Sequence, residues 1–76
     1  MKKQRIEYIS PLDALVALAK QLSLYEAQYS MESEDFFDKY SKGQMGDIID
    51  FVEWSNNYQH YVEMKLDIEK QLRHAA

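Results

Sequence analysis

The sequence has no cysteine, one proline and two glycines among its 76 residues. Without cysteine, the chain can form neither disulfides nor thiolate metal sites. The single proline, Pro11, and the glycines, Gly43 and Gly46, leave the rest of the chain without strong helix breakers. Long apolar runs are also missing, because the longest spans only residues 14–19. A membrane-spanning helix needs about 20 apolar residues, so the pattern predicts no such helix.

The first five residues are basic, as in the start of a signal peptide, and include Lys2, Lys3 and Arg5. No apolar core segment or small-residue cleavage site follows them. We therefore expect a cytoplasmic protein.

The chain is long enough for one domain. A domain of this size buries only about 60% of the surface that its unfolded chain exposes, so its stability is small. Domains this small often gain stability from disulfides, a metal or a second subunit. Because cysteine is absent, a protein partner or a second copy of the chain is the expected source of extra stability.

Charge is distributed unevenly along the chain, whose net charge is −4. Residues 26–53 contain eight acidic side chains against Lys39 and Lys42, a local net charge of −6, whereas residues 54–76 are balanced. An acidic middle repels phosphate backbones and therefore disfavours nucleic-acid binding. It would attract a basic protein and speed the encounter. The alternative is that these acidic side chains only keep the protein in solution.

A first helix is predicted over residues 11–29. Ser10 is a suitable N-cap, Pro11 occupies the first helical position, and Asp13 completes a capping-box pattern. Apolar residues then recur at spacings of three and four, which indicates an amphipathic helix. These are Leu15, Leu18, Leu22, Tyr25 and Tyr29.

A second, shorter helix is predicted over residues 34–42. Ser33 is its expected N-cap, and acidic residues follow in the first turn, where the helix dipole favours them. Phe36, Phe37 and Tyr40 supply an apolar side. Gly43 after Lys42 predicts a left-handed stop.

A long C-terminal helix is predicted over residues 47–73, with Asp47 as its N-cap. Ser55, Asn56 and Asn57 are weak helix formers. They leave open whether the helix is continuous, although the absence of glycine and proline favours continuity. Together the patterns predict an all-α, three-helix domain over residues 10–76, preceded by a tail of residues 1–9.

Catalytic and metal-binding patterns are weak. His60 and Glu63 have the reverse of the order found in di-iron helical bundles, and the pair occurs once. Asp47, Asp50 and Glu53 are spaced three apart and so were considered as a divalent-metal or hydrolase site. Three acidic residues at a helix start are better explained by the helix dipole. We predict a non-enzymatic protein without a metal or cofactor.

Aromatic residues make up 13% of the chain, more than a small three-helix core can enclose. Tyrosine and tryptophan combine an apolar body with a polar tip and are enriched at protein interfaces. Phe36 and Phe51 are better explained as core residues, and Tyr58 and Tyr61 as interface residues, whereas Trp54 fits either role. The aromatic content therefore favours a binding protein.

Three neighbouring motifs form a recognisable signature. They are Phe36-Phe37-x-Lys39-Tyr40, Gly43-x-x-Gly46-Asp47 and Asp50-Phe51-Val52-Glu53-Trp54. This signature resembles a family of small all-helical bacterial proteins, mostly uncharacterised, that are associated with toxin–antitoxin modules. The resemblance covers roughly residues 8–76. It implies an antitoxin-like role in which the chain holds a basic toxin, such as a ribonuclease, inactive.

The resemblance departs from better-known antitoxins, because the sequence shows no ribbon-helix-helix or helix-turn-helix module for operator DNA. Our first hypothesis is therefore a protein-interaction module. Its predicted partner-binding residues are Phe36, Tyr40, Asp47, Asp50, Glu53, Trp54, Tyr58 and Tyr61. The alternative is a structural homodimer whose long third helices pair along Trp54, Tyr61 and Ile68.

Overall fold

The computed structural model describes residues 10–75, which form three α-helices. These are α1 (Pro11–Tyr29), α2 (Ser33–Ser41) and α3 (Ile49–Ala75). The predicted all-α class with a long C-terminal helix is confirmed. The predicted tail of residues 1–9 lies outside the described residues. Within residues 10–75, none of the helices has the length and apolar content needed to cross a membrane.

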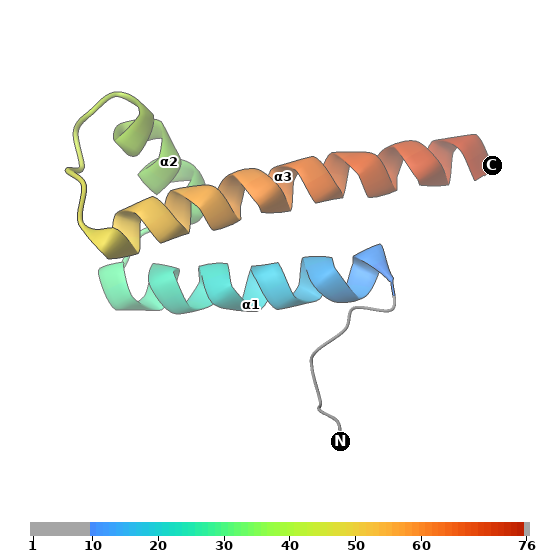
Figure 1. Ribbon diagram of the computed structural model, residues 1–76, viewed down its shortest axis with the longest axis horizontal. Helices are drawn as coiled ribbons and strands as arrows, with labels where there is room; N and C mark the ends of the chain where they lie inside the picture. The colour runs from blue at the N-terminus through green and yellow to red at the C-terminus, as the bar shows by residue number, and fades with distance from the viewer. Residues whose placement is uncertain (1–9, 76) are drawn as a thin grey trace, which may run out of the picture.

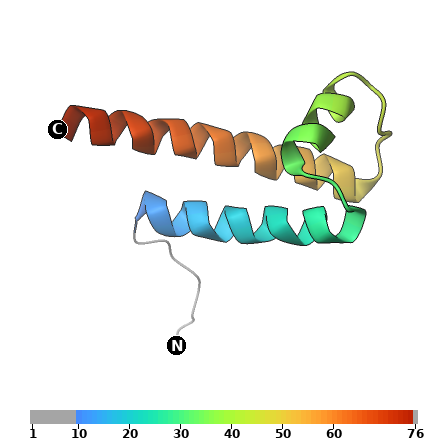
Figure 2. The same cartoon turned by 180° about the vertical axis from the view of Figure 1, so that it is seen from behind.

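Helices α1 and α3 lie side by side and run in opposite directions (Figure 1). The short helix α2 packs where α1 ends and α3 begins, so within residues 10–75 three helices are in contact at that end alone (Figures 1 and 2). The C-terminal part of α3 extends past the start of α1. The fold is thus a two-helix ribbon closed at one end by a third helix.

Helix α1 begins as its sequence predicts. Ser10 has extended backbone angles, and its hydroxyl accepts a hydrogen bond from the Asp13 amide at 3.2 Å. Pro11 occupies the first turn, where its missing N–H costs nothing. The helix ends at Ser30, which has a φ of 53° and donates its amide to the Glu26 carbonyl. This left-handed residue turns the chain towards α2.

Helix α2 begins at Ser33, one residue earlier than predicted, and Glu32 occupies the N-cap position. The predicted capping role of Ser33 is therefore wrong. Its hydroxyl instead accepts a buried hydrogen bond from the indole Nε1 of Trp54 at 2.9 Å, and its amide donates to the Glu26 carboxylate at 2.9 Å. Ser33 thus links α2 to both other helices.

The connection from α2 to α3 uses both glycines in left-handed conformations. Gly43 has a φ of 75° and Gly46 a φ of 84°, conformations that glycine adopts without steric cost. Helix α3 begins at Ile49, and the amides of its first turn donate to the Ile48 carbonyl. The predicted capping role of Asp47 is wrong, because Asp47 lies in the loop before that residue and is exposed.

Helix α3 continues through Ser55, Asn56 and Asn57, as the preferred prediction had it. Contacts beyond the helix backbone offset the weak helix propensity of this stretch. Ser55 is buried and its carbonyl and hydroxyl accept from the Gln59 amide, while Asn57 donates across to Gln21 of α1 at 3.1 Å.

The core is small and lies at the three-helix end. Its buried apolar residues among those described are Leu22, Phe36 and Trp54, one from each helix. The Trp54 ring stacks on Phe36 of α2, with centroids 3.9 Å apart and planes at 3°. It also stacks on Tyr25 and Tyr29 of α1, with centroids at 5.5 and 5.8 Å. Trp54 is therefore the residue through which all three helices pack.

Candidate partner-binding face

The structure distributes the predicted partner-binding residues over three places. Phe36 and Trp54 are fully buried, Tyr40, Tyr58 and Tyr61 are half-buried on the side of α2, and Asp47, Asp50 and Glu53 lie near the start of α3. They do not form one continuous surface.

Phe36 and Trp54 have exposed fractions of 0%. Neither side chain offers area to a partner in this fold, so the core explanation holds for both. The predicted homodimer seam also needs revision at Trp54, because that ring is covered by α1 and α2.

The predicted tyrosines lie around α2. Tyr40 stacks on Phe36 with centroids 5.4 Å apart, and Tyr58 packs against Phe37 with centroids 5.2 Å apart. Tyr61 joins Tyr58 in a depression where the three helices meet. This surface is separate from the acidic residues at the start of α3.

Two of the acidic residues, Asp50 and Glu53, belong to a series of hydrogen bonds that crosses from α1 to α3, which we call the seam ladder. Tyr29 donates to Asp50 at 2.6 Å, Tyr25 to Glu53 at 3.2 Å, and Asn57 to Gln21 at 3.1 Å. The spacing of these residues along the two antiparallel helices, three or four at each step, keeps each pair in register. The seam ladder thus holds two carboxylates in defined positions on the surface.

The two tyrosines of the seam ladder are poor acids. The hydrogen bond to Asp50 raises the pKa of Tyr29 above 10.0, with burial and the Asp50 charge adding to the effect. Burial raises the pKa of Tyr25, as do the hydrogen bond to Glu53 and the charges of Glu53 and Asp50. Both phenols therefore remain protonated donors at neutral pH.

These pKa shifts predict a loss of stability in alkali. The unfolded tyrosines ionise near pH 10.0, whereas the folded ones resist ionisation. Their contribution is present below pH 10 and is lost as the pH rises through the raised folded pKa. We expect the free energy of unfolding, measured by urea titration at pH 8 to 11, to fall more steeply for the native chain than for a Tyr25→Phe, Tyr29→Phe variant. Equal slopes would contradict the ladder's role.

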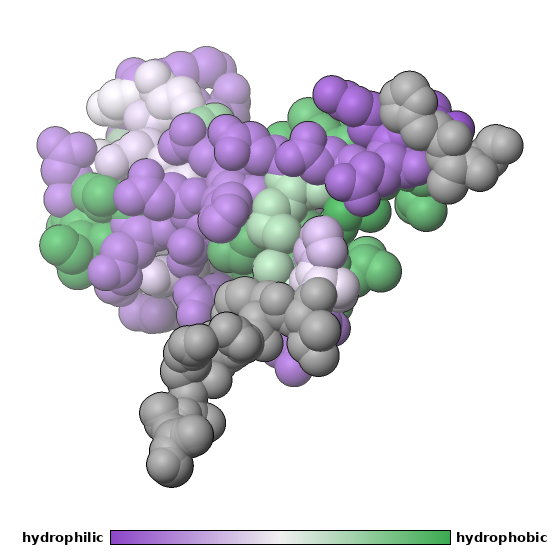
Figure 3. Space-filling view, turned by 45° about the vertical axis from the view of Figure 1, so that its right-hand side comes forward, coloured by the Kyte–Doolittle hydropathy of each residue, from purple (hydrophilic) through white to green (hydrophobic). Residues whose placement is uncertain are grey.

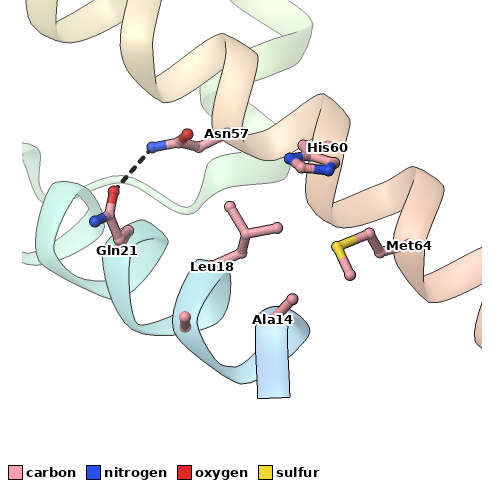
Figure 4. Close-up of a pocket in the computed structure, with 7 residues that line it drawn as sticks. Ala14, Leu18, Gln21, Asn57, His60 and Met64 are labelled. Carbon is pink, nitrogen blue, oxygen red and sulfur yellow. Dashed lines mark hydrogen bonds between the residues drawn. The ribbon is translucent and has the colours of Figure 1, made fainter. Parts of the chain in front are cut away.

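Beyond the seam ladder the groove between α1 and α3 opens into a hollow. Figure 4 shows Leu18 and Ala14 of α1 facing His60 and Met64 of α3, with the Gln21–Asn57 hydrogen bond at one end. Figure 3 shows hydrophobic surface gathered in a recess between the C-terminal part of α3 and α1. The hollow measures about 360 Å³, near the lower limit of small-molecule sites, and is open to one side. It suits an apolar side chain of a protein partner.

One stripe of α3 carries the seam ladder and the hollow together. Its residues follow one another at spacings of three and four and are Ile49, Glu53, Asn57, His60 and Met64. Ile49 is 71% exposed, so the stripe begins with an exposed apolar side chain, continues with acidic and polar groups, and ends in the hollow. We call this surface, with the facing residues of α1, the seam face.

Sequence reasoning missed the Gln21–Asn57 hydrogen bond and the hollow. The repeat of Tyr25 and Tyr29 was visible, but nothing in it indicated their carboxylate acceptors. The small side chains Ala14 and Ala17, which leave the space of the hollow, were the available signal.

The three acidic residues considered as a metal site do not share a helix. Asp47 lies in the loop, and Asp50 and Glu53 each accept a hydrogen bond from a tyrosine. In the part of the chain that the structure describes, no three acidic or histidine side chains converge as metal ligands would.

Comparison with protein-family models, with curated proteins and with solved structures found no match to this chain.

Proposed function

We propose that the protein is a cytoplasmic interaction module that binds a basic protein partner through its seam face, in the manner of an antitoxin that neutralises a small basic toxin. The family resemblance of the sequence supports the antitoxin-like role. The geometry of the seam face supports a basic partner.

The observation that carries the proposal is the pair of carboxylates held by tyrosines. Glu53 is exposed and Asp50 half-buried, and each accepts a hydrogen bond from a phenol that carries no charge of its own. The carboxylates are already positioned and therefore lose less rotational freedom on binding. Lysine or arginine side chains of a partner can form charge-assisted hydrogen bonds with them.

The hollow adds an apolar contact at a defined distance from the acidic pair. From Glu53 to His60 and Met64 is seven to eleven residues, or roughly 10 to 16 Å along the helix axis. A partner that fits would present a basic side chain and, two to three turns away, a bulky apolar one. Such an alternation of basic and apolar side chains is what a helix laid along the groove provides.

The proposed site differs from the predicted one. It keeps Asp50 and Glu53 near the start of α3, whereas Asp47 lies in the loop before that helix and outside the seam face. It adds Tyr25 and Tyr29 as positioning residues and the hollow as an apolar contact. Tyr40, Tyr58 and Tyr61 belong to the separate surface around α2.

A charge-reversal experiment tests this proposal. The product of a neighbouring gene for a small basic protein would be expressed alone, where we expect it to arrest growth, and then together with this chain, which should restore growth. A Glu53→Lys variant is expected to bind the partner at least tenfold more weakly, a loss of about 1.4 kcal/mol, and to fail in the rescue. Isothermal titration calorimetry with the purified pair would measure the affinity.

The matched control is Glu69→Lys, which makes the same charge change at an exposed site of α3, about 160° round the helix from Glu53. It should bind and rescue as the native chain does. Equal losses from both variants would show that net charge alone matters and would reject the seam face as the site. A native chain that neither binds nor rescues would reject the antitoxin-like role.

A further inference from the structure

Among residues 10–75, no helix other than α2 covers the side of the ribbon on which α2 lies at one end. In Figure 2, α2 lies in front of the first part of α3, its connecting loop reaches the end of α1, and no other described helix continues along that side. The contacts of α2 with α3 extend to Phe37 against Tyr58 and to the neighbourhood of Val62. Beyond Val62, no contact with α2 is described, and the last part of α3 also extends past the start of α1 (Figure 2).

The apolar pattern of the core continues into this uncovered stretch. Tyr61 and Ile68 follow Trp54 at intervals of seven residues, or two turns, and therefore lie on nearly the same side of α3. Leu72 comes eighteen residues after Trp54, which is five full turns. On α1, Leu15 precedes the buried Leu22 by the same interval of seven. Apolar residues of α1 and α3 thus recur along the ribbon at the spacing of the core residues Leu22 and Trp54. No residue of α2 covers them, because α2 is too short to reach this part of the ribbon.

Without a covering helix, apolar side chains along this stretch are exposed to water. Leu72 is 65% and Leu12, three residues before Leu15, is 58% exposed, while Leu15, Tyr61 and Ile68 are half-buried. We call this surface the open groove. It is defined by Leu12, Leu15, Tyr61, Ile68 and Leu72. Burial of such a surface is favourable in proportion to the apolar area removed from water, and the small core has few other sources of stability.

We propose that the open groove is occupied by the open groove of a second copy of this chain, in an antiparallel pair related by a two-fold axis. Each α3 then supplies the third helix that the other ribbon lacks. The two ribbons form a four-helix bundle, with one α2 at each end. This interface differs from the predicted homodimer interface, which included Trp54. Trp54 is buried in the core, and the proposed contacts are made by Tyr61, Ile68 and Leu72.

Length is the first argument for a second copy. The uncovered part of α3, from Val62 to Arg73, is about 16 Å long. It is bounded by α2 on one side and by the end of the helix on the other. An antiparallel copy has an uncovered part of the same length, so each helix end meets the α2 of the other copy. The pair is then covered by one α2 at each end, and the apolar residues of both copies meet in its centre.

Charge is the second argument. Residues 26–53, with a net charge of −6, are concentrated at the α2 end, and residues 54–76 are balanced. A parallel pair would bring the two acidic ends together, whereas an antiparallel pair separates them by more than the screening length of about 8 Å. The antiparallel arrangement also brings Arg73, near the end of α3, towards Glu34 of the second copy. Glu34 lies beside Tyr58 and Tyr61, at the end of the groove that α2 closes.

The oligomeric state of the full chain tests the pairing. Sedimentation velocity at about 10 to 300 µM should give twice the mass of one chain. Leu72→Glu, at an exposed position, is expected to raise the dissociation constant at least tenfold without unfolding the chain. The matched control is Leu24→Glu, which is 71% exposed and lies on the opposite side of α1 from Leu22. It should leave the mass unchanged.

A charge exchange tests the antiparallel register. Arg73→Glu and Glu34→Arg should each weaken the pair several-fold, and the double variant should recover the native dissociation constant. A single-chain mass for the native protein at every concentration, or equal effects of Leu72→Glu and Leu24→Glu, would overturn the pairing. Failure of the double variant to recover would overturn the antiparallel arrangement.

The pairing is independent of the proposed partner binding, because the open groove and the seam face use different sides of α3. Leu72→Glu should bind the basic partner as the native chain does, and Glu53→Lys should still form the pair. The two proposals therefore succeed or fail separately.

Discussion

Replacement of Trp54 by alanine is expected to leave the chain largely unfolded in the absence of a partner. The ring is fully buried and stacks on residues from both other helices. Truncation of a buried tryptophan typically costs 3 to 5 kcal/mol, roughly as much as the whole stability of a domain of this size. The loss would appear as a fall in circular dichroism at 222 nm under native conditions. This signal reports the helical backbone, so it can be measured in a variant that lacks tryptophan.

Two further variants are expected to lose less stability than Trp54→Ala. Trp54→Phe keeps an apolar ring and should fold with reduced stability in a urea titration. Leu24→Ala, at an exposed site, should change the free energy of unfolding by no more than about 0.5 kcal/mol. A Trp54→Ala chain with native helicity and a native urea midpoint would contradict the position of the core.

Replacement of Ser33 by alanine is expected to cost about 1 to 3 kcal/mol, the penalty for a buried polar group that loses its partner. Ser33 is 2% exposed, and its hydroxyl accepts the indole N–H of Trp54 in the core. The serine side chain is small, so the loss of packing area adds little. Urea titration followed by circular dichroism would measure the change.

A double-mutant cycle separates the hydrogen bond from any other role of Ser33. In a Trp54→Phe background there is no indole N–H to satisfy, and Ser33→Ala should then cost markedly less than in the native chain. A cost that is the same in both backgrounds would show that the hydroxyl stabilises α2 itself, as a cap would, and would contradict the tertiary role found here.

The core and the seam face share two residues, and this links stability to binding. Tyr25 and Tyr29 stack on Trp54 with their rings and hold Glu53 and Asp50 with their hydroxyl groups. Loss of Trp54 would therefore disorder the acidic pair as well as the core. A variant such as Tyr25→Phe separates the two, because it keeps the ring and removes only the hydroxyl.

Most of the secondary structure could be predicted from the sequence, because local interactions decide it. The Ser10 and Pro11 start of α1 depends on hydrogen bonds and torsions within one turn. The end of α2 depends on the freedom of Gly43 to adopt a positive φ. Such features depend on residues that are neighbours in the chain, and the predicted ends of α1 and α2 lie within one residue of those observed.

The sequence fails to predict hydrogen bonds in which a side chain bonds to a residue of another helix and not to a nearby backbone group. Ser33 was predicted to cap α2, but its hydroxyl accepts a hydrogen bond from Trp54, twenty-one residues away. Asp50 lies in the first turn of α3, as the helix-dipole explanation requires, but the hydrogen bonds of Asp50 and Glu53 with tyrosines of α1 were not predicted. Both the Ser33 bond and the tyrosine bonds depend on how α3 is placed against the other two helices, and this placement is absent from any local pattern.

The sequence alone determined that this chain is helical, where its helices turn, and that its middle is acidic, since propensity, caps and charge are properties of adjacent residues. Only the tertiary structure decided which aromatic rings are enclosed, which carboxylates are held at the surface, and that α2 covers just one end of the ribbon. The physical reason is that burial depends on the relative placement of whole helices. A stripe of evenly spaced apolar residues looks the same along its length, although Trp54 is covered by Phe36 and Leu72 is left in water.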